Sequence, residues 1–234
     1  MNILALDTAA RFCSIALSCG KSGNWYFEID AGQRHSELLM EGVDMLMKIA
    51  GLKPADLDLA ACMRGPGSFT GLRIAFSAAK GMCLALGIPL ISIPTLDCMA
   101  FSAKAFPGIV IPAIDAKKRS FFTALYREEK RLTDYIDAPL EEIAQLISQH
   151  SNEHLLFTGP DADMLKSELH NLIEPNLYEK IRLDPARKKG RAYELLEIAK
   201  TEVAEKNGLE NITNEVFSGP LYIRKSDAEL SRKE

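Results

Sequence analysis

Two stretches in different halves of the chain repeat one pattern, and this repeat constrains the fold more than any other feature. Ala5-Leu6-Asp7 and Ala113-Ile114-Asp115 both end an apolar run with an aspartate. Further matches at the same spacing are Arg11 with Arg119 and Ala16-Leu17 with Ala124-Leu125. The match rests on few positions and can arise by chance. If it reflects a duplication, each half builds a strand that ends in an aspartate, a turn and a returning strand.

The first half of the chain alternates between strand and helix patterns. Apolar runs predict strands at residues 3–6, 14–17, 25–29, 57–63 and 88–93, and helices at residues 36–50 and 72–86. Gly51 and Gly87 follow the two helices directly, where glycine readily adopts the left-handed conformation that ends a helix. This order predicts an α/β layer architecture with a mixed sheet. Pro107 marks the predicted boundary between lobes 1–106 and 107–234.

Composition excludes several classes of protein. With 28 basic and 32 acidic residues the net charge is −4, so any contact with nucleic acid has to be local or carried by a partner. No apolar run reaches the ~20 residues of a membrane helix, and the apolar start has no basic leader, which predicts a cytoplasmic protein that does not span a membrane. The five cysteines form no Cys-x-x-Cys pair and are interpreted as reduced core thiols.

A glycine-rich stretch, 65–73, lies between a predicted strand and a predicted helix. Backbone N–H groups of such a turn converge at the helix N-terminus, where the helix dipole favours an anion. The spacing, however, fits neither the G-x-G-x-x-G fingerprint nor a P-loop. Spacing alone therefore favours a tight turn, with Ser68 or Thr70 capping the helix and Gly71 allowing close packing. A phosphate cradle is the alternative.

The two repeated aspartates are candidate cation ligands. Each ends a strand, where a carboxylate could hold a hydrated Mg²⁺ beside phosphates. It is equally plausible that each carboxylate binds the N–H groups of the turn after its strand. The candidate residues for residual nucleotide or anion binding are Asp7, Thr8, Gly65, Gly67, Ser68 and Asp115.

Other constellations that carry catalysis or metal binding are not found. The four histidines, His35, His150, His154 and His170, form no helical metal pair, and we predict no metal site. No G-x-S-x-G nucleophile elbow is present, and no catalytic residue is predicted. The basic stretch 187–191 is interpreted as a solvated approach to a helix at residues 191–206, with contact to RNA phosphates as the alternative.

Several stretches, spread over nearly the whole chain, resemble the TsaB (YeaZ-like) family of tRNA threonylcarbamoyladenosine biosynthesis. The glycine-rich stretch is the most specific of them. They are Ile3-Leu4-Ala5-Leu6-Asp7-Thr8, His35-Ser36 with Leu38-Leu39, Gly65 to Arg73, Ile114-Asp115-Ala116, and Pro220-Leu221-Tyr222-Ile223-Arg224. One departure from the family is Ile223, where leucine is common, and this exchange conserves volume.

The resemblance implies a two-lobed actin-like ATPase/sugar-kinase fold with mixed sheets and duplicated lobes. It implies a heterodimer with the paralogue TsaD, which transfers threonylcarbamoyl to the adenosine next to the anticodon, and association with the ATPase TsaE. The chain would reach tRNA only through this complex. Whether it forms a homodimer when alone stays open.

Compared with the catalytic paralogue, the chain looks degenerate. A His-x-x-x-His metal pair is missing from the first lobe, and the glycine pair that backs adenosine is reduced to Thr158-Gly159-Pro160. The resemblance therefore implies a non-catalytic scaffold with no cofactor, or at most weak Mg²⁺–nucleotide binding. The alternative is a free-standing actin-fold kinase or a peptidase-like hydrolase.

The predicted partner surface lies on the first two helices. Apolar residues cover an arc of about 200° on the helix at 36–50, wider than the ~100° stripe that covers a sheet, so the surplus is expected to be exposed. The helix at 72–86 is also apolar on most sides. In the TsaB family these helices contact TsaD. The predicted interface residues are Leu39, Met40, Val43, Met47, Ile74 and Met82.

Overall fold

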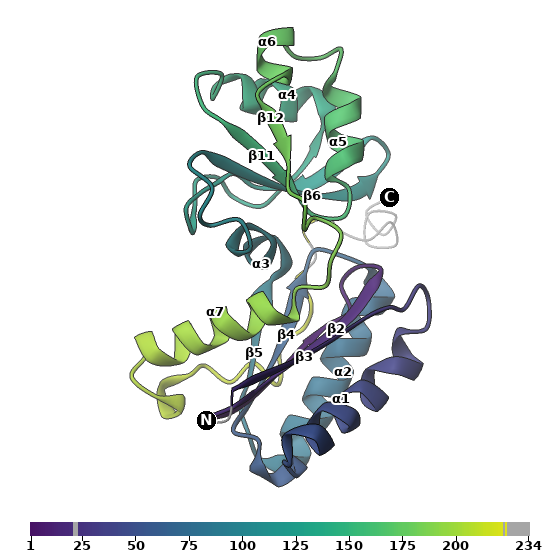
Figure 1. The fold of residues 1–234 in the computed structure, drawn as a ribbon, viewed down its shortest axis with the longest axis vertical. Helices are drawn as coiled ribbons and strands as arrows, with labels where there is room; N and C mark the ends of the chain where they lie inside the picture. The colour runs from purple at the N-terminus through teal and green to yellow at the C-terminus, as the bar shows by residue number, and fades with distance from the viewer. Residues whose placement is uncertain (21–22, 222, 224–234) are drawn as a thin grey trace, which may run out of the picture. The chain divides into compact units, whose positions relative to one another are not determined.

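The computed structural model describes residues 1–20, 23–221 and 223, and the chain forms two compact units (Figure 1). The first unit contains residues 1–98 and 189–220, and the second contains residues 99–188 together with the described residues 221 and 223. Tyr222 and Arg224, which belong to the stretch that resembles TsaB at the C-terminal end, lie outside the described residues.

The first unit is a five-stranded mixed sheet of order β3-β2-β1-β4-β5. β1 pairs antiparallel with β2, β2 pairs antiparallel with β3, and β4 and β5 continue parallel to β1. The strands are β1 (Asn2–Asp7), β2 (Phe12–Cys19), β3 (Asn24–Asp30), β4 (Leu59–Gly65) and β5 (Leu90–Pro94). The helices are α1 (His35–Ala50), α2 (Phe69–Leu86), α3 (Thr95–Phe101), which runs into the second unit, and α7 (Ala192–Glu205), with short 3₁₀ turns η1 (Pro54–Asp56) and η2 (Leu209–Asn211).

Helices cover both faces of the first sheet, because successive side chains of a strand point to opposite faces. Leu4 and Leu6 of β1 pack in one core with apolar residues of α1 and α2. Ile3 and Ala5 pack in a second core with the apolar side of α7. Figure 1 shows α1 and α2 together on one side of the sheet and α7 on the other. β1 is therefore buried on both faces.

The second unit repeats the strand order of the first. Its main sheet path is β10-β7-β6-β11-β12, again with an antiparallel three-strand part and two strands added in parallel. The strands are β6 (Ile109–Lys117), β7 (Ser120–Thr123), β8 (Tyr126–Arg127), β9 (Lys130–Arg131), β10 (Ile136–Pro139), β11 (Leu155–Thr158) and β12 (Ile181–Leu183). The helices are α4 (Leu140–Ser148), α5 (Ala162–Leu169) and α6 (Pro175–Tyr178). The shared topology confirms the duplication.

The repeat is shifted by one residue in the returning strands. In the first hairpin Asp7 pairs with Ser14, whereas in the second Asp115 pairs with Phe121. Lys117, Lys118 and Arg119 between the strands all have positive φ angles, of 64°, 55° and 60°. The second turn is thus tighter than a constant spacing predicts.

The division into units differs from the predicted boundary at Pro107. The chain passes into the second unit after Cys98 and returns after Lys188, so residues 189–220 belong to the first unit rather than to a C-terminal lobe. The reason is the apolar side of α7, where Leu195, Leu196 and neighbouring residues are fully buried against the first sheet. The helix itself lies close to the predicted range 191–206.

Candidate functional site

The carboxylate of Asp7, at the end of β1, is fully engaged by its own unit. Its Oδ1 accepts the N–H of Ala9 at 2.9 Å, and its Oδ2 accepts the N–H of Arg191 at 2.8 Å and the Ser14 hydroxyl at 3.3 Å. Asp7 is 3% exposed, and this burial raises its pKa, although the three hydrogen bonds and the charge of Arg191 oppose the rise. Asp7 is an acceptor that holds the turn after β1 and the start of α7.

The glycine-rich stretch packs directly against the residues that follow Asp7. Thr8 is fully buried and its hydroxyl donates to the carbonyl of Gly71 at 2.7 Å, while the N–H of Ser68 donates to the carbonyl of Ala9 at 2.7 Å. A Cβ at Gly67 would lie 2.6 Å from the Ala9 carbonyl oxygen. The glycine at this position is therefore needed for the close approach of two turns.

Ser68 also caps α2. Its side-chain oxygen accepts the N–H of Gly71 at 3.2 Å, which satisfies one of the free donors of the first turn. Of the two predicted caps, the structure uses Ser68, and α2 begins at Phe69, before the predicted start at residue 72. Gly65, at the end of β4, has a φ of 107°. These contacts are those of the tight turn that the spacing favoured.

Asp115, the corresponding residue of the second unit, also binds its own turn. It accepts the N–H of Lys117 at 2.7 Å and the ammonium group of Lys117 at 2.5 Å, and its own N–H donates to Asp161 at 2.8 Å. Partial burial acts to raise the pKa of Asp115, but the bonds from Lys117 outweigh it and the net pKa is lowered. Asp7 and Asp115 belong to different units, and each accepts hydrogen bonds from the turn that follows its own strand.

A second set of polar contacts lies beside Asp7 and was not predicted from the sequence. The N–H of Gly190 donates to Glu28 at 2.8 Å, and the Tyr26 hydroxyl donates to the same carboxylate at 2.5 Å. A Cβ at Gly190 would lie 2.3 Å from the Ser14 hydroxyl oxygen. The one sequence signal for these contacts was Gly190 itself, a glycine directly before the helix predicted at residues 191–206. These contacts hold the chain to β2 and β3 where it returns from the second unit.

The basic stretch 187–191 is only in part the solvated approach that we predicted, because Lys188 and Lys189 are exposed whereas Arg187 and Arg191 are not. Arg191 is 2% exposed, and its guanidinium donates to Glu194 at 3.3 Å. Arg187 makes two bonds of 2.8 Å to Asp163, and Lys188 pairs with the same carboxylate at 3.0 Å. The interpretation failed for Arg187 because Asp163 is distant in sequence, and for Arg191 because its backbone N–H donates to Asp7 on β1.

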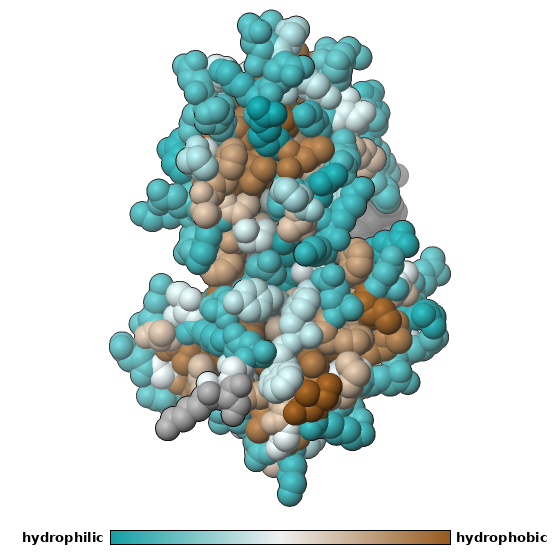
Figure 2. Space-filling view, viewed as in Figure 1, coloured by the Kyte–Doolittle hydropathy of each residue, from teal (hydrophilic) through white to brown (hydrophobic). Residues whose placement is uncertain are grey.

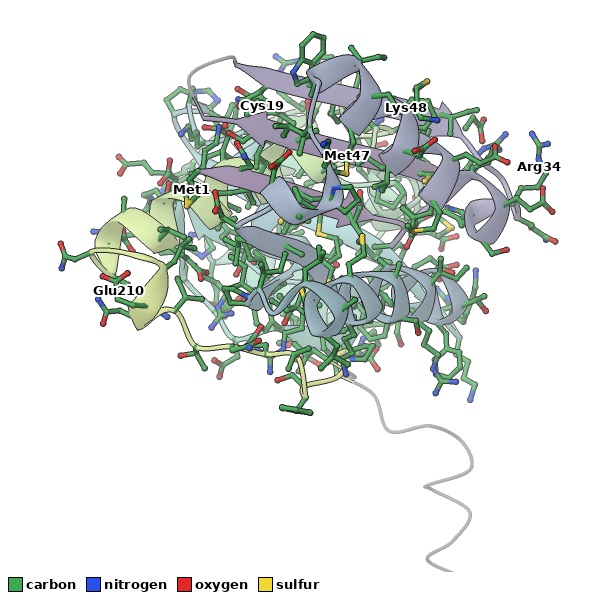
Figure 3. All side chains as sticks on the ribbon, turned by 90° about the horizontal axis from the view of Figure 1, so that it is seen from below. Met1, Cys19, Arg34, Met47, Lys48 and Glu210 are labelled. Atoms are coloured by element: carbon green, nitrogen blue, oxygen red, sulfur yellow. The ribbon has the colours of Figure 1, made fainter. Side chains whose placement is uncertain are left out.

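A groove lies between α1 and α2, the two helices that run side by side in Figure 3. Its volume is about 480 Å³. Met40 and Phe69 on its walls are 46% and 52% exposed, and the guanidinium of Arg73 stacks over the Phe69 ring at 3.7 Å. The lining residues are Ser36, Leu39, Met40, Phe69, Thr70, Arg73, Ile74, Ser77 and Ala78. The groove is a mainly apolar recess with one cation at its edge.

The predicted interface residues divide into two groups. Leu39, Val43 and Met47 are 1%, 3% and 5% exposed and pack in the core under α1. The prediction of Val43 and Met47 as contact residues is therefore corrected, whereas Leu39 also lines the groove. Ile74 and Met82 are half-buried against the same core, and Met40 is exposed. The central part of the apolar arc faces the sheet, and its edges supply the surplus. The other exposed apolar residues of these helices are Met45, Ile49, Phe69 and Leu84.

The two units share one mixed-sheet topology, and this duplicated arrangement is that of the actin-like ATPase fold class. A solved structure described as YeaZ from Pseudomonas aeruginosa superposes with a TM-score of 0.76 at 24% identity and covers 94% of this chain and 99% of its own. A second, described as an uncharacterized protein with similarity to peptidase YEAZ from the same organism, gives a TM-score of 0.76 at 25% identity over 95% of this chain and 99% of that one.

The matching family model is described as TsaD, tRNA N6-adenosine threonylcarbamoyltransferase, and spans residues 29–231. A relative named tRNA threonylcarbamoyladenosine biosynthesis protein TsaB from Escherichia coli is 36% identical over 56% of this chain, and the match spans 57% of the relative's length. A relative of the same name from Haemophilus influenzae is 28% identical over 96% of this chain and 94% of its own. The chain belongs to this family, and within it to the TsaB proteins.

Proposed function

We propose that the chain is a non-catalytic subunit in the synthesis of threonylcarbamoyladenosine on tRNA, and that it forms a heterodimer with a TsaD-type paralogue that performs the transfer. The observation that carries this proposal is the exposed apolar surface of α1 and α2. We define the partner face as Met40, Phe69 and Leu84 together with the groove between the two helices. The names of the relatives supply the reaction.

The surroundings of the two aspartates support the absence of catalysis. An enzyme has to place a base, nucleophile or metal within hydrogen-bond reach of its substrate. Asp7 is buried with both oxygens occupied, so it could bind Mg²⁺ only by giving up bonds that hold α7. Asp115 is held by Lys117. A Mg²⁺–nucleotide could therefore bind these carboxylates only if these bonds were given up.

The composition of α2 supports a protein partner. This helix is long and apolar enough to cross a membrane by length and composition alone, yet it packs on β4 and only 33% of it is buried. Figure 2 shows apolar side chains reaching the surface of the first unit. An exposed apolar surface of this kind is typical of an interaction site, and its methionines can adapt to a partner.

The remaining parts of the assembly follow from the heterodimer. We propose that a TsaE-type ATPase joins the pair, that tRNA is reached through the complex, and that the protein acts in the cytoplasm. A homodimer that uses the same partner face is the competing state of the isolated chain. Because both states would bury one surface, adding the TsaD-type partner should convert homodimer into heterodimer.

The proposal is tested by binding and by reconstitution. We expect the lone chain to show no ATP turnover, peptide cleavage or threonylcarbamoyl transfer, and the full set of partners with threonylcarbamoyl-adenylate and tRNA to show transfer. Met40→Glu with Phe69→Glu should abolish binding to the TsaD-type partner, because both residues are exposed and charges on an apolar interface are costly. The matched control is Leu132→Glu with Leu172→Glu, two exposed leucines of the second unit.

Two results would contradict the proposal. Unchanged affinity of the folded Met40/Phe69 variant would exclude the partner face. Activity of the lone chain that disappears in Asp7→Ala while the fold persists would instead support the alternative, a free-standing kinase or hydrolase. Circular dichroism of each variant separates loss of binding from loss of folding.

A further inference from the structure

The segment that follows α7 ends in a short turn that exposes one aromatic ring. Phe217 is 89% exposed, more than any other large apolar side chain in the described part of the chain. A phenylalanine ring can bury more than ~150 Å² in a contact. A single exposed apolar residue needs no explanation by itself. Phe217 differs from other exposed apolar residues because its backbone is anchored on both sides and because it lies beside α2.

The chain just before Phe217 is anchored to the edge of the first sheet. The N–H of Glu215 donates to the carbonyl of Leu90 on β5 at 2.8 Å. The Glu215 carboxylate accepts the N–H of Ser92 at 2.6 Å and its hydroxyl at 2.5 Å. Val216 is 6% exposed and belongs to the core under α1 and α2. Val216, directly before Phe217, is thus fixed in the core of the first unit.

The chain just after Phe217 is anchored as well. The N–H of Ser218 donates back to the carbonyl of Glu215 at 2.8 Å and closes a turn around Val216 and Phe217. The carbonyl of Ser218 accepts a hydrogen bond from the Lys80 ammonium group of α2. With both sides held, the backbone under the ring loses little freedom when a partner binds, which favours affinity.

The bond from Lys80 places this turn beside the outward side of α2. Leu84 lies one helical turn after Lys80 and is 64% exposed. Between them, a Cβ built at Gly81 would meet no atom within 4 Å, so the helix backbone is open to close approach there. Phe69 at the groove and Leu84 thus lie on the exposed side of α2, and the turn with Phe217 lies beside this helix.

We propose that Phe217 is an anchor residue of the heterodimer interface, whose ring inserts into an apolar pocket of the TsaD-type partner beside the helices that cover α2. This inference rests on the proposed function, and the bond from Lys80 identifies the partner, because it fixes the turn to the helix that carries the partner face. Rigidly held aromatic residues are the type that dominates binding energy in protein interfaces. No position in 212–220 was predicted as a contact from the sequence.

The first test is binding of the full-length Phe217→Ala variant to the TsaD-type partner by calorimetry. The fold should be unchanged, because the ring contributes little to the core. Truncation of an anchor should raise the dissociation constant about 30-fold, which corresponds to about 2 kcal/mol. Phe69→Ala is the reference variant inside the groove, and Leu172→Ala in the second unit is the matched control, expected to bind like the wild type.

The second test measures burial of position 217 in the complex. All five native cysteines are buried, so a Phe217→Cys variant presents one accessible thiol for alkylation. Saturating partner should strongly slow this alkylation, whereas alkylation of Leu172→Cys should keep its rate. Lysate proteins or lipid vesicles in place of the partner should give no protection.

The outcomes separate this inference from the function on which it rests. If Phe69→Ala weakens binding while Phe217→Ala stays within about twofold of the wild type, the anchor is refuted and the heterodimer stands. Equal alkylation of position 217 with and without partner would refute the anchor as well. If the wild type itself does not bind the partner, the proposed function fails. Protection by a second copy of the chain alone would assign Phe217 to a homodimer instead.

Discussion

Replacing Gly71 by alanine should destabilise the first unit, because position 71 has no room for a side chain. A Cβ there would lie 1.9 Å from the carbonyl oxygen of Thr8, a separation that real Cβ atoms do not show. The turn after β1 and the start of α2 would have to separate by about 1 Å. Such a shift breaks the bond from the Thr8 hydroxyl to Gly71 and the bond from Ser68 to Ala9, both 2.7 Å long.

The magnitude follows from three contributions. Overpacking of a close contact costs about 1–3 kcal/mol. Two lost hydrogen bonds in a buried region cost about 1 kcal/mol each. Alanine is favoured over glycine in a helix by about 1 kcal/mol, which offsets part of the loss. The expected net loss is about 2–4 kcal/mol in the free energy of unfolding.

Urea unfolding can measure this loss for the first unit alone. The only tryptophan of the chain, Trp25, lies on β3, so its fluorescence reports this unit. Gly81→Ala in the same helix is the matched control, because its Cβ would meet no atom within 4 Å, and it should stabilise the unit by about 1 kcal/mol. A Gly71→Ala variant as stable as the wild type would refute the close-packing account. If it lost only nucleotide or phosphate binding, the glycines would instead form an anion cradle.

Three further predictions test the second unit, the division of the chain and the thiols. The pKa of Asp163 is lowered to about 2, mainly by its hydrogen bonds from Arg187. The ionised carboxylate should therefore stabilise the fold above pH 3.8, and this stabilisation should disappear as the pH falls toward about 2. Asp163→Asn should remove this acid dependence from the unfolding curves. Leu196→Ala, at a fully buried position on α7, should cost about 2–5 kcal/mol by Trp25 fluorescence, and a loss confined to the second unit would contradict the assignment of α7. Burial raises the pKa of Cys83 to about 11, so a thiol reagent near pH 7 should react with the cysteines only after unfolding, and rapid labelling of the native chain would show an exposed thiol.

Local patterns predicted most of the first unit. Gly51 and Gly87 have φ angles of 71° and 69° and end α1 and α2 where the sequence indicated. These features depend on neighbours in the chain, because hydrophobic periodicity and glycine conformation act over a few residues. The duplication was visible for the same reason, since each aspartate directly follows its own strand.

Prediction from the sequence failed where contacts join segments that are distant in the chain. Met47 and Met40 lie on the same apolar arc of α1, yet one is buried and the other is exposed, and only the position of the sheet distinguishes them. Lys188 and Arg191 belong to one basic stretch, but Lys188 pairs with Asp163 while Arg191 is buried near Asp7. Burial and charge pairing are properties of the folded neighbourhood, which a linear pattern does not contain.

The sequence by itself therefore determined the elements, the repeated topology and the family resemblance, because these follow from short-range patterns and from specific motifs such as the glycine-rich stretch. Only the tertiary structure decided that residues 189–220 complete the first unit, that Asp7 holds the start of α7, and that the turn with Phe217 is held beside α2. Each of these rests on hydrogen bonds or apolar burial between segments more than a hundred residues apart. Such contacts form only when the chain has folded, so their partners have no signature in either segment alone.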